Sequence, residues 1–348
     1  MTAKKTSLKD LSDYLGLSQT TVSRGLADYP EVAARTKTRI RQAAAELNYA
    51  PSSSAQKLAT GRALAIGHVI TLSDHMTLNP FYADFIAGAG ETYADSGYDM
   101  LISMVSRDKE LETYRALTNS QKVDGFVLSE PVPDDPRIAL LQELAIPFIV
   151  HGRTSASIST PSDYSWLDVN NKRGFETASR YLLELGHRQI ALINGPDWLS
   201  FAQRRKAGFE AALLDCGVTC PEAWIFATDM SERKGFEIAS QLLQQRQRPT
   251  AILCSSMLLA LGVQRAMHSQ GLQIGADISL ICWDDCLSAF DNQTTPPQFT
   301  SMRSSIFDAG AMVAECLLAQ IESPTTLLHA RILEAELVKG QSTGPVKS

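Results

Sequence analysis

The 348-residue sequence has no run of about 18 uncharged apolar residues, the length that a membrane-spanning helix needs. Its basic first residues, Met1 to Lys5, lead into a mixed polar segment instead of the apolar stretch of a secretory signal. Hydrophobic residues make up 44% and charged residues 20%, which excludes a disordered or fibrous chain. We therefore expect a cytosolic globular protein, and at roughly 150 residues per domain it has two or more domains.

Cysteine is scarce and poorly spaced for metal binding. The six cysteines include two C-x-x-x-C pairs, Cys216 with Cys220 and Cys282 with Cys286, whereas a zinc site typically uses C-x-x-C spacing or nearby histidines. We expect reduced structural thiols, as is usual for a chain of this size without a secretory signal. The sequence predicts no metal ligands.

Two signature motifs of nucleotide and metal enzymes are absent, because the sequence contains no G-x-x-x-x-G-K-[ST] and no H-E-x-x-H segment. Gly88 and Gly90 lie inside a helical stretch and not at a strand-to-helix turn, which argues against a dinucleotide site. We predict no catalytic residues, no cofactor and no enzymatic activity.

Charge is unevenly distributed along the chain. Residues 1–61 contain nine basic and five acidic residues, a net charge of +4, whereas the whole chain carries −6. The remaining residues therefore carry −10. A basic segment on an acidic body suits a polyanion such as nucleic acid as the partner of that segment.

The basic segment begins with a predicted helix over residues 8–15. Leu8, Leu11 and Leu15 fall at positions i, i+3 and i+7, the spacing of one helical face. Ser7 stands at the position of an N-cap, and Gly16 stands where a left-handed residue commonly ends a helix.

A second short helix is predicted from Gln19 to about Ala27, capped by Ser18, and a third from about Ala33 to Leu47. Helix, glycine turn and helix form the helix-turn-helix pattern. Short polar and cationic side chains on the outer face of the second helix suit contacts with base edges. They are Gln19, Thr20, Ser23 and Arg24. The alternative is a helical hairpin whose polar face has no such role.

A family resemblance is carried by residues 7–24 (SLKDLSDYLGLSQTTVSR), 39–51 (RIRQAAAELNYAP) and 55–59 (AQKLA). Together they resemble the N-terminal signature and hinge helix of the LacI/GalR family of bacterial transcription regulators. The most specific feature is Thr-Val-Ser-Arg followed by Leu-Asn-Tyr-x-Pro. The resemblance extends to about residue 338, nearly the whole chain.

The resemblance implies that the second helix is a recognition helix. Gln19 and Thr20 would contact base edges at its start, with Arg24 one turn further on. Thr21 and Ser23 would bind backbone phosphates.

The resemblance also implies a hinge helix or linker at residues 51–61, in which Leu58 would enter the minor groove as an apolar wedge. Serines at residues 52–54 are mediocre helix formers, so we expect the hinge to fold only on DNA. The alternative is that Leu58 is an ordinary packing residue.

Downstream of the hinge, short apolar segments alternate with helix-length segments, which predicts α/β architecture with doubly wound parallel sheets. The predicted strands are Ala65–Ile70, Met100–Met104, Gly125–Leu128, Pro147–Val150, Ile190–Ile193, Thr250–Cys254 and Ile278–Cys282. The helical segments are 82–96, 109–121, 171–185, 205–216, 231–246 and 257–270.

This body resembles the two-lobed, periplasmic-binding-protein-like core of the same family. The resemblance implies a helix-turn-helix domain at 1–50, the hinge at 51–61, a ligand-binding and dimerisation core at 62–340 and a tail at 341–348. The N-lobe would span about 62–163 and 294–322, including a late helix at about 305–320, and the C-lobe about 164–292 and 323–340. The chain would cross between lobes near residues 163, 292 and 323.

Ligands of such sheets bind beyond the carboxyl ends of the strands. Arg205 lies in a segment that matches the family's Arg-x-x-Gly-Phe motif, and Asp284 in one that matches Gly-Tyr-Asp-Asp. Guanidinium and carboxylate groups bind adjacent sugar hydroxyls through charge-assisted hydrogen bonds. The other candidate ligand contacts are Phe81, Tyr82, His151, Arg153, Asp229, Ser256 and Trp283.

Some candidates have a structural alternative. Asp284 and Arg205 would also suit a purely structural ion pair, and His151 a scaffold role. Ser256 and Met257 stand where many family members carry Asn-Asp, which makes the pocket less polar.

The resemblance implies a cytoplasmic, nucleoid-associated homodimer that represses genes of carbohydrate uptake or catabolism and leaves its operator DNA when a sugar binds. Helices 82–96 and 109–121 are the expected dimer face. An activator, or a co-repressor with a purine or other non-sugar ligand, stays open, because the same residue types suit a nucleobase. Alternatives of other classes are a small-molecule transport receptor and a cleft enzyme.

Overall fold

The computed structural model describes residues 6–49, 61–71, 80–154, 162–290, 292, 294–323 and 328–347. The chain divides into two compact units, Met1–Ala63 and Leu64–Ser348, which are described separately below. The predicted hinge residue Leu58 lies outside the described residues.

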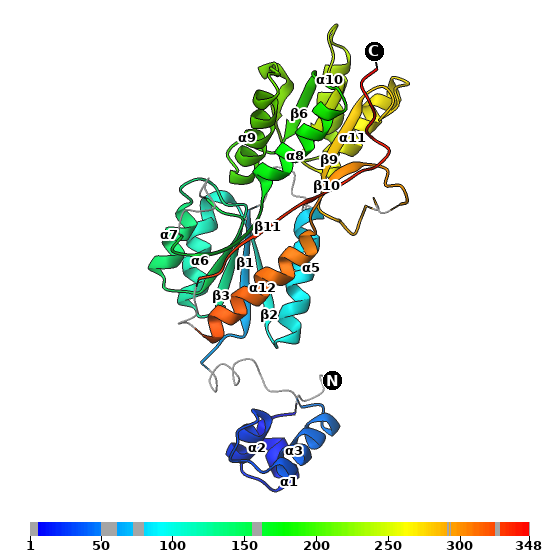
Figure 1. The fold of residues 1–348 in the computed structure, drawn as a ribbon. Coiled ribbons are helices and arrows are strands. Elements are labelled where there is room, and N and C mark those ends of the chain that lie inside the picture. The colour runs from blue at the N-terminus through cyan, green and yellow to red at the C-terminus, as the bar shows by residue number, and fades with distance from the viewer. Residues whose placement is uncertain are drawn as a thin grey trace. The chain divides into compact units, whose positions relative to one another are not determined.

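The first unit contains helices α1 (Leu8–Leu15), α2 (Gln19–Leu26) and α3 (Ala34–Glu46), as the sequence predicts (Figure 1). Ser7 and Asp10 form a capping box at the start of α1, and Gly16 ends that helix with a φ of 65°. Leu11, Val22 and Ile40 are fully buried between the three helices. Local capping signals and one apolar stripe per helix therefore account for this unit.

The second unit consists of two lobes, each built on a six-stranded sheet (Figure 1). The N-lobe sheet has the order β11-β5-β4-β3-β1-β2, and all of its strand pairs are parallel. Its strands are β1 (Ala65–Thr71), β2 (Asp99–Val105), β3 (Gly125–Ser129), β4 (Phe148–His151), β5 (Ser165–Val169) and β11 (Ala330–Leu333). Helices α5 (Pro80–Asp95) and α12 (Ile306–Glu322) cover one face, and α6 (Glu110–Asn119), preceded by the short η1 (Arg107–Lys109), and α7 (Pro136–Glu143) cover the other.

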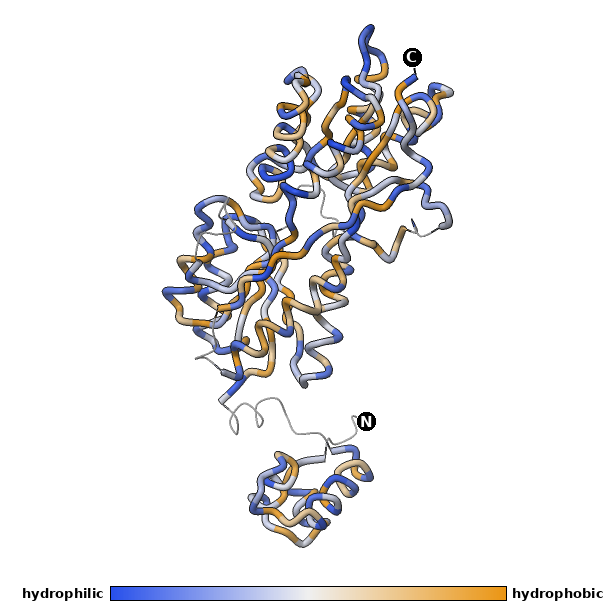
Figure 2. Tube along the Cα trace, in the orientation of Figure 1, coloured by the Kyte–Doolittle hydropathy of each residue, from blue (hydrophilic) through white to orange (hydrophobic). Residues whose placement is uncertain are grey.

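The C-lobe sheet has the order β12-β10-β9-β8-β6-β7, in which only the pairing of β12 is antiparallel. Its strands are β6 (Ile190–Asn194), β7 (Ile225–Ala227, after the short η2, Glu222–Trp224), β8 (Ala251–Cys254), β9 (Ser279–Asp284), β10 (Thr300–Arg303) and β12 (Glu336–Val338). Helices α8 (Asn171–Glu184) and α9 (Ser200–Asp215) cover one face, and α10 (Glu232–Leu243) and α11 (Met257–Ser269) cover the other. Apolar residues concentrate on the sheet strands (Figure 2) because both faces of each sheet are covered.

Glycine allows the covering helices to pack closely in pairs. A Cβ atom at Gly208 of α9 would collide with the carbonyl oxygen of Lys172 in α8. Gly310 of α12 meets the carbonyl of Phe85 in α5 in the same way. Gly208 and the fully buried Phe209 therefore serve packing, and they fix the helix that carries Arg205.

The three crossings between lobes lie later in the chain than the sequence predicts. Strand β5 still pairs within the N-lobe sheet, so the first crossing follows Val169 and not residue 163. Strand β10 pairs with β9, which moves the second crossing from residue 292 to residues 304–305. Strand β11 belongs to the N-lobe, so the third crossing lies between Leu333 and Glu336 and not near 323. These short strands carry polar residues at several positions, which hides them from a search for apolar runs.

The residues predicted as a separate tail belong to the C-lobe. The Ser342 carbonyl accepts a hydrogen bond from the Leu280 amide at 2.8 Å, and its Oγ accepts one from the Thr300 amide at 2.8 Å. Residues Gly340 to Gly344 match the G-x-S-x-G pattern of hydrolase nucleophiles. Ser342 is nevertheless fully buried, and an irregular segment follows it instead of a helix. The segment is therefore a structural anchor.

Candidate functional site

Helix α2 presents most of its polar side chains to the surface of the first unit. Gln19, Thr20 and Arg24 are exposed, whereas Thr21 and Ser23 are half-buried. The Thr21 hydroxyl lies 2.8 Å from the hydroxyl of the N-cap Ser18. Five of the six predicted DNA contacts thus lie on one short helix, and three of these five are exposed.

Arg24 carries an ion pair that leaves it accessible. Its Nη1 lies 3.3 Å from Glu31 Oε1, and about half of each side chain is exposed. Exposed pairs of this kind contribute about 0–1 kcal/mol. The guanidinium can therefore exchange Glu31 for another hydrogen-bond acceptor at little cost.

The second unit contains a cavity of about 470 Å³ that both lobes line. Its walls come from the carboxyl ends of strands such as β1, β3 and β4 in the N-lobe and from α9 and the end of β9 in the C-lobe. This is the position at which doubly wound sheets bind ligands. Of the predicted ligand contacts, the structure brings together Phe81, Tyr82, His151, Arg205 and Trp283 around the cavity.

Arg205 is fixed in the cavity wall. Its Nε donates to Asn171 Oδ1 at 2.7 Å and its Nη1 to the Ser255 carbonyl at 2.6 Å. The guanidinium carbon lies 4.2 Å from the ring centre of Trp283 and 4.8 Å from that of Phe201. Burial lowers the pKa of Arg205 to about 10, which leaves it charged at neutral pH. Since no described residue bonds its Nη2, this rigid donor suits a ligand hydroxyl or carboxylate.

Of the two adjacent aspartates, Asp285 lines the cavity and the predicted Asp284 does not. Asp284 points away from the cavity, where its Oδ1 accepts the Cys286 amide at 2.9 Å and its Oδ2 lies 3.6 Å from Arg303 Nε. Asp285 Oδ1 accepts the Trp283 indole N–H at 3.0 Å. Burial raises the pKa of Asp285 to about 7. Asp284 therefore does not pair with Arg205 either.

Three further candidates miss the cavity, two of them by one residue. Ser256 caps α11 by accepting the Leu259 amide, and the adjacent Ser255 lines the cavity. Exposed Asp229 lies outside the lining, and the adjacent Met230 lies in it. Neighbouring side chains along extended backbone point in opposite directions. A prediction that is wrong by one residue at a strand end therefore selects a side chain that points away from the cavity.

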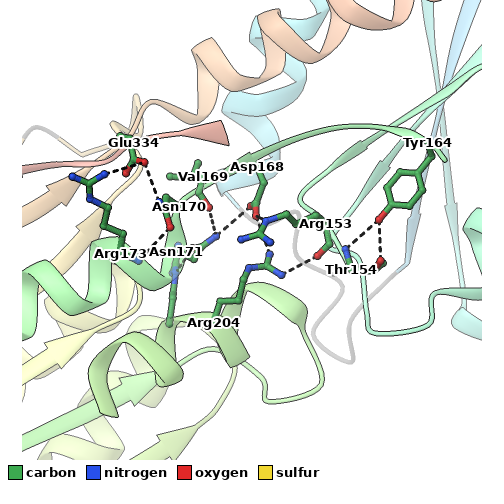
Figure 3. A network of polar contacts seen from close by, with 11 residues as sticks. Arg153, Thr154, Tyr164, Asp168, Val169, Asn170, Asn171, Arg173, Arg204 and Glu334 are labelled. Carbon is green, nitrogen blue, oxygen red and sulfur yellow. Dashed lines mark hydrogen bonds and ion pairs between the residues drawn. The ribbon is translucent and has the colours of Figure 1, made fainter. Parts of the chain in front are cut away.

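Arg153, the third of these candidates, belongs to a buried ionic network instead (Figure 3). Its Nε lies 2.9 Å from Asp168 Oδ2, and Arg204 Nη2 approaches the same oxygen at 3.1 Å. Arg204 Nη1 also donates to the Arg153 carbonyl at 2.9 Å. Because Asp168 lies in β5 of the N-lobe and Arg204 in α9 of the C-lobe, this network joins the two lobes.

Asn171 connects this network to Arg205. Its Nδ2 donates to Asp168 Oδ1 at 3.3 Å, while its Oδ1 accepts from Arg205 Nε. The neighbouring Asn170 donates to Glu334 Oε1 at 2.9 Å and thereby ties the first crossing to the third (Figure 3). No motif marks Asp168, Asn171 or Arg204 in the sequence, apart from their positions near the end of β5 and in α9.

The part of the N-lobe wall formed by Tyr82, Phe85 and His151 is aromatic. His151 stacks on Phe85 with ring centres 4.6 Å apart, and His68 Nδ1 lies 3.2 Å from the Tyr82 hydroxyl. Burial lowers the pKa of both histidines to about 4. At neutral pH this part of the wall therefore offers flat rings and neutral hydrogen-bonding groups.

No three His, Cys, Asp or Glu side chains among the described residues come together as a metal site would require. None of the helices that the structure describes combines the length and apolar character needed to cross a bilayer.

Family models match both units of the chain. Residues 7–52 match the model of the bacterial regulatory proteins, lacI family, and residues 63–330 match that of the periplasmic binding proteins and sugar binding domain of the LacI family. The chain belongs to the LacI family of bacterial regulators. Membership in this family of regulators agrees with the prediction that the chain is not an enzyme.

LacI-family relatives match over nearly the whole length. The HTH-type transcriptional regulator AglR of Rhizobium meliloti (strain 1021) is 40% identical over 338 residues, 97% of this chain and 94% of AglR. A structure of the Lac repressor dimer bound to operator and the anti-inducer ONPF superposes with a TM-score of 0.81 at 28% identity, covering 98% of this chain and 100% of that one. A structure of the transcriptional regulator CelR in complex with cellobiose superposes with a TM-score of 0.70 at 26% identity, covering 97% of this chain and 100% of that one. The predicted fold, a helix-turn-helix head on a two-lobed core, is confirmed.

Proposed function

We propose that this LacI-family chain is a homodimeric, sugar-responsive repressor of carbohydrate uptake or catabolism genes. The observation that carries the proposal is the pairing of an exposed recognition helix with an interlobe cavity that offers Arg205, Asp285 and aromatic rings. Sugars bind to such sites through planar charged groups and aromatic faces. AglR and CelR, with its bound cellobiose, support a saccharide as the effector.

The mechanism is thermodynamic linkage between the cavity and the helix-turn-helix unit. A ligand changes operator affinity only if it binds the DNA-competent and DNA-released states with different affinities. The Arg204–Asp168 contact joins the lobes, and both residues line the cavity. A bound sugar can therefore change the relative stability of different lobe arrangements. Helix α2 carries the base contacts, and Leu58 of the hinge is proposed as the minor-groove wedge.

A dimer places two recognition helices on a near-palindromic site, with half-sites about one helical turn apart. The proposed dimer face lies around α5 and α6 of the N-lobe. Its edge strand β2 exposes Ile102, which is 41% accessible and lies outside the cavity lining. An exposed apolar edge strand is typical of a surface that another chain covers. The bacterial cytoplasm, at the nucleoid, is the compartment that this function requires.

The test is selection of duplexes from a random DNA library by the full chain, followed by titration with sugars. We expect enrichment of a near-palindromic sequence, loss of binding when residues 1–63 are removed, and release of the duplex by a sugar. Absence of any enriched sequence would contradict a DNA-binding regulator. Tighter duplex binding with ligand would identify a co-repressor, and response to a purine alone would replace the sugar.

A further inference from the structure

The loop between α2 and α3 carries two carboxylates and no basic residue. Glu31 reaches back to α2, where its Oε1 lies 3.3 Å from Arg24 Nη1. Asp28 faces α3 instead: its Oδ1 accepts a hydrogen bond from Arg41 Nη2 at 2.8 Å and lies 3.2 Å from Lys37 Nζ. The loop therefore pairs with three of the six basic residues that the structure describes in the first unit.

The backbone of this loop is anchored on both sides of Glu31. The Tyr29 amide donates to the carbonyl of Arg24 at 3.0 Å, which ties the loop to the last turn of α2. Val32 is only 8% exposed, and its Cγ1 would be in van der Waals contact with a Cβ atom at Gly25. Glu31 lies between these two anchored residues, so packing and not its ion pair sets the position of its backbone.

This anchoring distinguishes the Arg24–Glu31 pair from most exposed ion pairs. Such pairs contribute little because two flexible side chains must be held in one geometry. Here the carboxylate is presented by a fixed loop, and it engages only Nη1 of the guanidinium. No described residue bonds Nε or Nη2 of Arg24, and a guanidinium has five N–H donors. Arg24 can therefore keep Glu31 while it binds a second acceptor.

The edge of Arg24 that remains free suits one base. Guanine presents two acceptors, O6 and N7, in the major groove, and two N–H groups of one arginine pair with them. This contact forms only when the planar guanidinium is correctly oriented, whereas a phosphate accepts a hydrogen bond from any of its donors. A carboxylate on Nη1 limits the rotation of the guanidinium. It therefore favours a base contact over a phosphate contact.

The negative charge of Glu31 acts in the same direction. DNA of any sequence attracts cations to its phosphates, and this attraction supplies nearly all of non-specific binding. A carboxylate fixed beside Arg24 competes with phosphates for that guanidinium. Interactions between exposed charges of this kind change an affinity by up to about fivefold. Glu31 should therefore weaken binding to DNA of unrelated sequence.

We propose that Glu31 is a specificity-determining positioning residue: it holds Arg24 through Nη1, so that the Nε and Nη2 edge meets guanine, and it disfavours contacts of Arg24 with phosphates. This inference rests on the proposed function, because it concerns the base contact assigned to Arg24. Its consequence is a larger ratio of operator affinity to random-DNA affinity, without a requirement for tighter operator binding.

The test compares Glu31→Gln with wild type in anisotropy titrations of the full chain, using the selected operator and a random duplex of equal length. Random-DNA affinity should rise about threefold to fivefold while operator affinity stays the same or falls, so the ratio falls at least about threefold. On random DNA the slope of log K against log salt should steepen by about 0.9, the value for one further phosphate contact. Glu46→Gln is the matched control, because Glu46 is an exposed glutamate of the same unit that accepts a hydrogen bond from Tyr14.

Two further variants separate positioning from charge. Glu31→Asp keeps the negative charge but shortens the side chain by one methylene, so we expect the ratio to fall in this variant as well. In an Arg24→Ala background, Glu31→Gln should leave the ratio within about twofold, because Glu31 acts through Arg24. Since about half of the Glu31 side chain is exposed, the Tm of each Glu31 variant should stay within about 3 °C of its parent.

Three results would overturn the inference. They are an unchanged or larger ratio in Glu31→Gln, a wild-type ratio in Glu31→Asp, or an equal fall in the ratio when residue 24 is already alanine. Each of these leaves the DNA-binding regulator intact. If the wild-type chain prefers no sequence over random DNA, the proposed function fails together with the inference.

Discussion

The helix-turn-helix unit and the two-lobed core use charged residues differently. In the first, Arg24–Glu31 and Arg41–Asp28 are surface pairs whose side chains are about half exposed. In the core, Arg153, Asp168 and Arg204 are all less than 10% exposed. Surface pairs contribute about 0–1 kcal/mol, whereas breaking a buried pair costs about 3–5 kcal/mol. Charge in the head is thus available to DNA, while charge in the core fixes the position of the lobes and the cavity wall.

The largest effect on the core is expected when the buried Arg205 is removed. Arg205→Ala deletes a buried guanidinium and leaves Asn171 Oδ1 and the Ser255 carbonyl without their donor. We expect sugar affinity to fall at least about 100-fold and the core to lose about 3 kcal/mol or more. Calorimetry and thermal unfolding measure the two effects. Operator affinity should persist without sugar, and a variant that still responds normally to sugar would place the effector elsewhere.

The next largest effect is expected at Asp285, for which the adjacent Asp284 provides a control. Burial holds the pKa of Asp285 at about 7, above the usual 3.8 of an aspartate. The folded protein therefore binds this proton more tightly than the unfolded chain does, and the stability it provides is lost as pH rises through 7. Asp285→Asn has no such dependence, so we expect its free energy of unfolding to gain on that of wild type between pH 5 and pH 8, by at most about 3 kcal/mol.

Asp284→Asn serves as the control, because Asp284 lies outside the cavity lining. Asp285→Asn should weaken sugar binding about tenfold or more, and Asp284→Asn should leave it within about twofold. Equal losses in both variants would show that the cavity does not distinguish the two carboxylates.

Breaking the contact between lobes should have an intermediate effect. Arg204→Met removes one of the two arginines on Asp168 but leaves Arg153 in place, so we expect a loss of about 1–3 kcal/mol in core stability. Sugar affinity should change with it, because the lobes meet through this pair. Lys206→Met, on the exposed side of the same helix, should change stability by less than about 0.5 kcal/mol. If Arg204→Met changed neither core stability nor sugar affinity, the lobes would be joined by other contacts.

The smallest effect on stability is expected in the head. Arg24→Ala should change unfolding free energy by less than about 0.5 kcal/mol, since its pair with Glu31 is exposed. It should nevertheless weaken the selected operator by about 1–3 kcal/mol and random DNA much less. Arg41→Ala, which removes a similar exposed pair outside α2, is the matched control. Equal losses on operator and random DNA would contradict base contact by Arg24, as anisotropy titrations with both duplexes can measure.

The cavity lining illustrates how far sequence-based inference reached. Arg205, Phe81 and Trp283 could be proposed from motifs and strand ends, and all three line the cavity. Asp284 and Ser256 were each placed one residue from the side chain that does so. An error of one residue is enough to miss the cavity, because neighbouring side chains of extended backbone point in opposite directions. Glu130 also lines the cavity and directly follows β3 with a φ of 53°, a backbone conformation that the sequence does not reveal.

Local sequence signals encode the three-helix head and the alternation of strands and helices in the core. Caps such as Ser7 and Ser18 and apolar spacing act within a few residues, so they can be recognised without knowledge of the fold. The lobe boundaries, and the contact of Arg204 with Asp168 across 36 residues of sequence, depend on the folded arrangement of the strands. Such contacts depend on how strands from distant parts of the chain pair, and this pairing leaves no local trace in the residues that it brings together.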